Sequence, residues 1–265
     1  MNEITITRRF YFCSSHRYYL ENLSFDENLR LFGKTIYEHG HNYTLFVSIR
    51  GNINKTTNMV MNISEIKNIV NEIIEKYYDH KNLNLDNPFF KNRLPTTENI
   101  ALSFWHFLSE KLNLYKILVY EGDEIFSEYK GEKNMLFGRV YKFSAGHRLY
   151  NENLSDEENN KLYGKCANKN GHGHDYKLEI YIEGKVDKET GFIVNINELD
   201  KIVNEVLEKI DHKFLNYDVE FFRENLPTTE NILIFLKMRL SSKIKGLKKL
   251  RIYETENNIF EIECV

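Results

Sequence analysis

The chain has 265 residues with 36 basic and 39 acidic side chains, and its formal net charge is −3. This near-neutral balance argues against a protein that binds nucleic acid by electrostatic attraction, and no apolar run reaches the roughly 20 residues of a membrane span. The cysteines Cys13, Cys166 and Cys264 form no CxxC pair, so we expect no disulfide scaffold and a cytoplasmic location.

Motifs of the first half return in the second half at nearly constant spacing. Residues 12–17 return as 143–148, an offset of 131, and residues 94–100 return letter for letter as 226–232, an offset of 132. This period is too long for a solenoid and predicts a tandem duplication. The expected domains are 1–131 and 135–265, with a short polar linker between them.

The first copy is predicted to contain two strands, two helices and two strands, in that order. Apolar and polar residues alternate from Tyr43 to Ile49, which is the period of a half-buried strand. An apolar stripe from Ile66 to Tyr77 predicts an amphipathic helix. A second helix is expected after the Pro-Thr-Thr-Glu segment at 95–98.

The second copy repeats this order. It predicts a strand over 176–182, a helix over 199–210, a second helix from Ile232, and a closing hairpin over 250–264 that turns at Asn257-Asn258. The elements indicate an α+β fold, in which each copy is an antiparallel sheet with two helices on one face (ββααββ).

A His-Gly-His motif occurs once in each copy. Side chains alternate along a strand, so His172 and His174 share the face of the buried row that continues at Tyr176. A buried imidazole without a partner costs free energy. A single such pair is nevertheless more often a hydrogen-bonded core pair than a set of metal ligands.

A third histidine ends the preceding strand in each copy and is expected to lie beside the pair. The second-copy set is His147, His172 and His174, and the first-copy set is His16, His39 and His41. Three neutral imidazoles with an open fourth position are typical of a catalytic Zn²⁺ site. Because the set occurs twice, we favour a metal over a core pair.

Other polar residues of the second copy are candidates for the same site. Asp211-His212 suggests a pair that handles protons, although a histidine after a helix also suits the helix dipole. Cys166 precedes His172 by six residues. Its thiol would act as a base near a metal, and otherwise it is a small buried apolar residue.

The second copy also offers a carboxylate for ligand binding. Glu254 ends an inward-facing row, where it would accept N–H donors from a guanidine-like heterocycle; a solvated strand end is the alternative. The segment 227–230 has a simple structural explanation as a threonine N-cap followed by an acidic first turn.

Together these motifs resemble the family of 6-pyruvoyl-tetrahydropterin synthase and 6-carboxy-tetrahydropterin synthase. The resemblance extends from about Gly138 to the C-terminus and is carried by segments 143–149, 164–166, 171–174, 211–212, 227–231 and 253–255. It implies two tandem tunnelling-fold domains, a Zn²⁺ cofactor and a pterin triphosphate substrate. The implied enzyme is a carbon–oxygen lyase that converts 7,8-dihydroneopterin triphosphate to 6-pyruvoyl-tetrahydropterin and eliminates triphosphate.

The resemblance also implies residue roles in the second copy, where the three histidines would bind zinc. Cys166 would be the general base, with Asp211 and His212 as its proton relay. The residues holding the pterin ring would be Thr229, Glu230 and Glu254.

The first copy departs from the family pattern at the catalytic cysteine. Aligning its Gly-Lys step with that of the second copy places Thr35 opposite Cys166, and Thr35 is no useful base at neutral pH. Glu38 is a weak candidate replacement, and Cys13 aligns with Ser144 and is expected to face elsewhere. We therefore expect an active C-terminal copy and a degenerate N-terminal copy.

The sequence leaves two other functions open. One is the 6-carboxy-tetrahydropterin synthase of queuosine biosynthesis, although the six-residue step from Cys166 to His172 favours the pyruvoyl product. The other is a non-catalytic scaffold that binds zinc or pterin. The resemblance also implies a homo-oligomer, for which a trimer of two-domain chains is one arrangement, and in it Asp79-His80 would serve Cys166 of a neighbouring domain.

Overall fold

The computed structural model describes residues 3–264, which form two compact units. The first unit runs to Gly138 and also includes Glu183–Asn197, a segment of the second repeat. The second unit contains Arg139–Ile182 and the chain from Glu198 onward. The predicted linker lies between strands β5 (Ile125–Tyr129) and β6 (Met135–His147).

The first unit is built on antiparallel strands in the order β5-β4-β2-β1, with the short strand β3 parallel to β1 at the edge. Its other strands are β1 (Ile4–His16), β2 (His39–Gly51), β3 (Lys81–Asn82) and β4 (Leu114–Glu121). Its helices are α1 (Phe25–Phe32), η1 (Gly33–Ile36), α2 (Ile63–Tyr77), α3 (Leu83–Asp86), η2 (Pro88–Phe90) and α4 (Thr97–Leu108).

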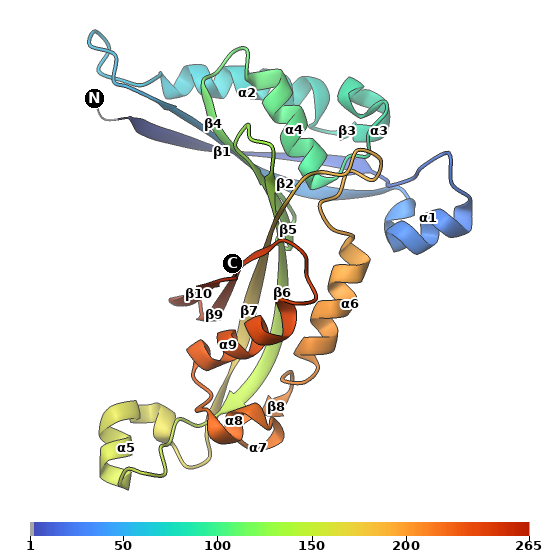
Figure 1. The fold of residues 1–265 in the computed structure, drawn as a ribbon. Helices are drawn as coiled ribbons and strands as arrows, with labels where there is room; N and C mark the ends of the chain where they lie inside the picture. Colours follow the sequence, from blue (N-terminus) through green and yellow to red (C-terminus); the bar gives the residue numbers. More distant parts are fainter. Residues whose placement is uncertain (1–2, 265) are drawn as a thin grey trace. The chain divides into compact units, whose positions relative to one another are not determined.

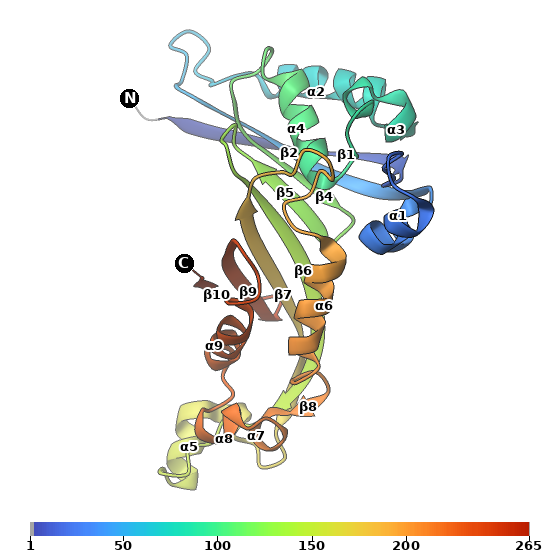
Figure 2. The ribbon, with the colours of Figure 1, turned by 45° about the vertical axis from the view of Figure 1, so that its right-hand side comes forward.

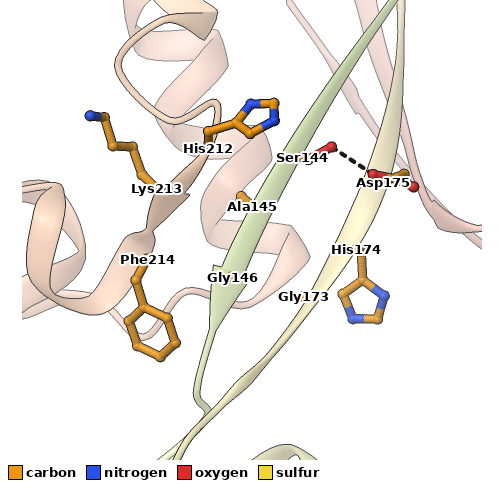
Figure 3. A pocket seen from close by; sticks show the side chains of 9 residues that line it. All are labelled: Ser144, Ala145, Gly146, Gly173, His174, Asp175, His212, Lys213 and Phe214. Atoms are coloured by element: carbon orange, nitrogen blue, oxygen red, sulfur yellow. Dashed lines mark hydrogen bonds between the residues drawn. The ribbon is translucent and has the colours of Figure 1, made fainter.

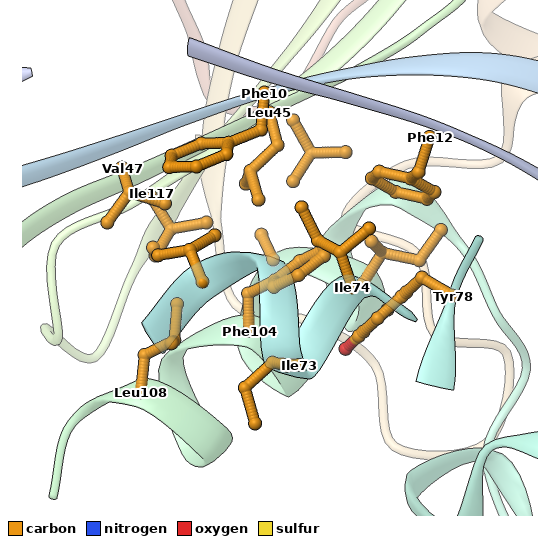
Figure 4. Packing of buried hydrophobic residues seen from close by; sticks show 14 of the residues in the cluster. Phe10, Phe12, Leu45, Val47, Ile73, Ile74, Tyr78, Phe104, Leu108 and Ile117 are labelled. Atoms are coloured by element: carbon orange, nitrogen blue, oxygen red, sulfur yellow. The ribbon is translucent and has the colours of Figure 1, made fainter. Parts of the chain in front are cut away.

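Helices α2 and α4 cover one face of these strands, as the sequence predicted (Figure 1). Leu45 of β2 is fully buried with Phe104 and Leu108 of α4 in the apolar core between the two layers (Figure 4). The core lies between the layers because every second strand residue and every third or fourth helix residue is apolar and faces inward.

The second unit repeats the pattern, with strands in the order β10-β9-β7-β6 and β8 beside β6. The remaining strands are β7 (His172–Gly184), β8 (Lys213–Phe214), β9 (Leu247–Thr255) and β10 (Asn258–Glu263). The helices are α5 (Asp156–Tyr163), η3 (Gly164–Ala167), α6 (Ile196–Leu207), α7 (Leu215–Asp218), α8 (Phe221–Glu224) and α9 (Thr229–Leu240). Figure 2 shows α6 and α9 running beside the strands of this unit.

The α+β fold and the two ββααββ repeats are confirmed, and each repeat adds short elements that the sequence did not predict. Thr96 and Thr228 cap α4 and α9 by accepting hydrogen bonds from the amides of Asn99 and Asn231. The predicted closing hairpin is β9 and β10. Among residues 3–264, no helix has the length and apolar character needed to cross a membrane.

We expect Leu45→Ala to destabilise the first unit by about 2–5 kcal/mol, because it opens a cavity under a fully buried side chain. The matched control is Leu85→Ala, since Leu85 is 82% exposed and should change stability by less than about 0.5 kcal/mol. Chemical unfolding followed by circular dichroism checks both. Equal effects of the two substitutions would contradict the assigned core.

Candidate active site

Paired strands bring three histidines together in the first unit. The antiparallel register of β1 and β2 places His16 opposite His39, and His41 follows two residues later on the same face. The ring centroid of His16 lies 4.6 Å from that of His39 and 5.3 Å from that of His41, and the latter two are 5.0 Å apart.

The second unit contains a matching triad on β6 and β7. The ring of His147 lies 4.5 Å from His172 and 5.4 Å from His174, with 5.0 Å between the last two. In each triad, one ring nitrogen per histidine lies within 4.8 Å of the others. The ring distances in the two triads are therefore nearly the same, although only the second repeat contains Cys166.

Backbone carbonyls orient the central histidine of each triad. His16 Nδ1 lies 3.0 Å from the carbonyl oxygen of Pro95, and His147 Nδ1 lies 2.6 Å from that of Pro227. A carbonyl only accepts hydrogen bonds, so Nδ1 carries the proton and Nε2 presents its lone pair to the other rings. His16 Nε2 is buried without a hydrogen-bond partner, and His147 Nε2 lies 3.1 Å from His172 Nε2. These inward nitrogens fit a metal ion.

The environment of the triads favours neutral imidazoles. Burial and the nearby His39 lower the pKa of His16 to about 3. Burial also lowers the pKa values of His41, His147 and His172. Neutral imidazole is the form that binds metal, so burial favours the metal-binding form of these four rings.

A glutamate lies beside each triad. Glu121 Oε1 is 3.4 Å from His41 Nε2, and Glu254 Oε1 is 3.9 Å from His174 Nε2. Glu254 accepts hydrogen bonds from Thr229 Oγ1 at 2.8 Å and from Asn258 Nδ2 at 3.1 Å. Burial raises the pKa of Glu254, but these hydrogen bonds together with the nearby His174 and His147 leave the pKa below its usual value. An ionised carboxylate therefore faces the second triad.

The Pro-Thr-Thr-Glu segments differ between the repeats. Thr229 is buried and bonds to Glu254, whereas Glu230 is exposed and points outside this pair. In the first repeat, Glu98 is fully buried and accepts hydrogen bonds from Thr97 Oγ1 and from the backbone N–H of Ile193, the latter at 3.0 Å. The structure thus joins Thr229 with Glu254 but leaves Glu230 apart.

The segment Glu183–Asn197 covers Glu98 in the first unit. The hydroxyl of Thr96 donates to the carbonyl of Gly191 at 2.7 Å, and a Cβ on Gly191 would come within 2.5 Å of Asn99. Phe192 is buried against Tyr18, whose ring also contacts His39. The first site is therefore closed on this side by chain from the second repeat.

The Asp-His motifs form the same turn in both repeats. Asp211 Oδ1 accepts the amide of Ser144 at 2.8 Å, the amide of His212 donates to the carbonyl of Ser144 at 2.6 Å, and His212 Nδ1 is 2.9 Å from Asp211 Oδ1. His212 has a φ of 53°, and His80 has a φ of 56°. Among the described residues, no hydrogen bond or ion pair joins this turn to Cys166.

Cys166 lies in η3, where its carbonyl accepts the amide of Leu149 at 2.9 Å. The carbonyl of Thr35 accepts the amide of Tyr18 at 2.8 Å in the same way, which supports the alignment of Thr35 with Cys166. The Thr35 hydroxyl donates to the carbonyl of Phe32 at 2.7 Å. The Cys166 thiol therefore has no chemical equivalent at this position.

A hollow of about 450 Å³ lies on the second unit between the Asp-His turn and the His-Gly-His strand. Figure 3 shows His212 on one side and His174 on the other, with Ser144 bonded to Asp175 between them. All three cysteines of the chain are free. The hollow lies on the Asp-His side of the strands, whereas His174 Nε2 is itself buried.

Two features of the first unit were missed by sequence reasoning. The cover over Glu98 comes from a remote segment and leaves no local signal. Cys13 faces away from the triad, as expected, but its place beside Asp79 and His80 was not predicted, and the equivalence of Cys13 with Ser144 was the signal available. Glu38 accepts a hydrogen bond from Asn82 at 2.6 Å, and among the described residues no contact joins it to the triad.

Comparison with known proteins gives one family for both repeats. A sequence model described as 6-pyruvoyl tetrahydropterin synthase matches residues 5–132 and again residues 138–264. Human 6-pyruvoyl tetrahydrobiopterin synthase is 44% identical over 124 residues, which is 46% of this chain and 86% of the relative.

Two further similarities cover about half of the chain. A protein of Archaeoglobus fulgidus, provisionally named 6-carboxy-5,6,7,8-tetrahydropterin synthase, is 35% identical over 131 residues, which is 49% of this chain and 97% of the relative. The solved structure of Caenorhabditis elegans 6-pyruvoyl tetrahydropterin synthase is 41% identical and covers 49% of this chain and 95% of its own, with a TM-score of 0.47.

The buried carboxyl of Glu98 predicts a pH-dependent stability. Burial raises its pKa to about 7, so between about 4.3 and that value the folded state keeps a proton that the unfolded state releases. Stability should therefore fall as pH rises through this window, by at most about 1.4 kcal/mol per pH unit.

Glu98→Gln should remove this part of the pH dependence, whereas Glu230→Gln at the exposed equivalent should not. Urea unfolding of the three proteins between about pH 5 and about pH 7 measures the slopes. An unchanged slope in the Glu98→Gln protein would show that its carboxyl is already ionised at low pH.

The two triads predict two independent zinc sites. His16→Ala and His147→Ala should each lower bound zinc by one equivalent relative to the parent protein, because each removes the central ligand of one triad. His106→Ala, at an exposed histidine outside both triads, is the control. Elemental analysis after dialysis measures the content, and an unchanged zinc content in either triad variant would contradict that site.

Proposed function

Because the chain belongs to the 6-pyruvoyl tetrahydropterin synthase family, we propose that it is a zinc-dependent lyase that converts 7,8-dihydroneopterin triphosphate to 6-pyruvoyl-tetrahydropterin and releases triphosphate. Family membership supports an enzyme that acts on pterins. The observation that carries the finer proposal is the second repeat, which combines a histidine triad, an ionised Glu254 beside it and the thiol of Cys166.

Glu254 and Thr229 are proposed to hold the pterin ring. The Glu254 carboxylate accepts one hydrogen bond from the Thr229 hydroxyl and one from the side-chain amide of Asn258. These two bonds hold the carboxylate in position before substrate arrives. A pterin presents neighbouring N–H donors that suit a carboxylate. Glu230 is exposed and would take part only if the bound state moves it.

The chemistry requires removal of a proton from the substrate side chain. A zinc ion bound by His147, His172 and His174 would acidify a C–H group next to the hydroxyls that it binds. Cys166 is the proposed base that takes this proton, and His212, held by Asp211 at 2.9 Å, is the proposed relay that returns protons to solvent. Internal tautomerisation then reduces the ring as a side-chain alcohol is oxidised to a ketone, so no external reductant is needed, and triphosphate leaves from the neighbouring carbon.

The first repeat is proposed to lack this turnover. Its histidine triad and Glu121 are present. The Thr35 hydroxyl, however, donates a hydrogen bond to the carbonyl of Phe32, and the Glu38 carboxylate accepts one from Asn82. No thiol base therefore stands at the position equivalent to Cys166. Glu98 is closed over by Ile193, which restricts access to the ring-binding residues of this repeat.

The 6-carboxy-forming enzyme is the second candidate, favoured by the provisional name of the Archaeoglobus fulgidus relative. Both reactions begin with the same triphosphate, and they differ in whether the side chain is retained or lost as acetaldehyde. A non-catalytic zinc- or pterin-binding scaffold is the third candidate. The intact Cys166 and Glu254 of the second repeat argue against the scaffold.

Incubation of the zinc-loaded protein with 7,8-dihydroneopterin triphosphate distinguishes the three functions. We expect triphosphate and 6-pyruvoyl-tetrahydropterin, identified by mass spectrometry of the products. Release of acetaldehyde with a 6-carboxy product would support the second candidate. No loss of triphosphate would support the scaffold and overturn our proposal.

Cys166→Ser should lower kcat by about 10²–10⁴-fold, which is the usual contribution of a positioned base. Cys264→Ser, at a thiol outside the site, should leave kcat unchanged. Zinc content and binding of the substrate should persist in both variants. Full activity of the Cys166→Ser protein would exclude this thiol as the base.

A further inference from the structure

The first repeat contains a second group of potential metal ligands, separate from its histidine triad. Cys13, Asp79 and His80 each place one ligand atom within 4.8 Å of the others. Cys13 Sγ lies 3.7 Å from Asp79 Oδ1 and 3.7 Å from His80 Nδ1, and His80 Nδ1 lies 2.9 Å from Asp79 Oδ2. A thiol, a carboxylate and an imidazole therefore lie close enough together to bind one ion.

The backbone holds Cys13 in this position from both sides. Its amide donates to Asp79 Oδ1 at 3.1 Å, and its carbonyl accepts the amide of His80 at 2.8 Å. The Asp-His turn is thus bonded to the same residue whose side chain it faces. The sulfur needs no rearrangement of the main chain to meet the carboxylate and the ring.

The two distances to sulfur agree with a tetrahedral centre. Bond lengths of about 2.3 Å to sulfur and about 2.0 Å to nitrogen or oxygen give edges of roughly 3.5 Å between sulfur and the lighter ligands. The two observed sulfur distances of 3.7 Å are within a few tenths of an ångström of this value. The His80 ring is largely exposed, so it can turn either nitrogen toward a bound ion.

The second repeat has the same turn without the sulfur. Ser144 takes the place of Cys13 and keeps both backbone hydrogen bonds to Asp211 and His212. Its hydroxyl bonds instead to Asp175 at 2.6 Å, as Figure 3 shows. The two repeats thus share one backbone frame, and only the first supplies a soft ligand.

We propose that Cys13, Asp79 and His80 form a binding site for a zinc-class divalent cation on the first repeat. Thiolate, imidazole and carboxylate together are a ligand set that zinc accepts. Binding converts the Cys13 thiol to a thiolate and releases its proton to solvent, so the charge of the ion is partly neutralised at once.

The site is separate from the histidine triad and has room for a further ligand. Cys13 and His16 differ by three residues on β1, so their side chains lie on opposite faces of the strand. Cys13 and Asp79 line a hollow of about 540 Å³. Three protein ligands beside this hollow leave a coordination position open for water or another small ligand.

Cobalt(II) titration tests this site by a signal that histidine triads cannot produce. Co²⁺ substitutes for zinc, and a sulfur ligand adds a near-ultraviolet charge-transfer band. We expect the parent protein to show this band and Cys13→Ser to lose it, because serine is the residue found on the same frame in the second repeat. Cys166→Ser and Cys264→Ser should retain it.

Further variants test the other two proposed ligands and the equivalent turn of the second repeat. Asp79→Asn and His80→Ala should weaken Co²⁺ binding at the sulfur site by at least the roughly 10–100-fold that loss of a supporting group costs. Ser144→Cys should add a second sulfur signal of similar intensity on the second repeat, next to Asp211 and His212.

The proposal is overturned if the parent protein shows no sulfur band, or if the band persists in Cys13→Ser. It is also overturned if the band disappears only in Cys166→Ser, since the sulfur ligand would then belong to the other repeat. These outcomes are independent of lyase activity, so a failure of the proposed reaction leaves the test intact. Circular dichroism of each variant checks that it is folded.

Discussion

The antiparallel register of β1 and β2 is the constraint on which the first site depends. Placing His16 opposite His39 puts three imidazoles on one face, because His41 is the next residue of the same parity. A slip of one residue would turn His39 and His41 to the other face and turn the apolar row from Tyr43 to Ile49 out of the core. The register of β1 and β2 that buries the apolar side chains therefore also determines how the three imidazoles are grouped.

Burial then determines the protonation state of the buried histidines. An imidazole inside the fold loses the hydration that a charged ring needs, and the carbonyls of Pro95 and Pro227 fix which nitrogen carries the proton. A glutamate side chain lies beside each triad. The two repeats keep this arrangement almost unchanged while differing at Thr35 and Cys166. The histidine triads thus differ less between the two repeats than does the position held by Thr35 in one and Cys166 in the other.

Local patterns in the sequence predicted the strands, the helices and the grouping of the histidines, since strand parity and helical spacing act over a few residues. His147 joins His172 and His174 for this reason. The contact of Ile193 with Glu98 was beyond sequence reasoning, because it joins residues far apart whose approach depends on the tertiary fold. Cys13 faces away from the triad, as its alignment with Ser144 led us to expect, but the alignment did not show that its thiol lies beside Asp79 and His80.

The segment Glu183–Asn197 belongs to the second repeat in sequence and to the first unit in space. Thr96, Glu98 and Leu31 all bond to it through Gly191, Ile193 and Asn195. Cutting the chain at the linker would therefore not yield two complete halves, because the first would lose the strip that shields its buried carboxyl. The boundary between the two repeats in the sequence therefore differs from the boundary between the two compact units in space.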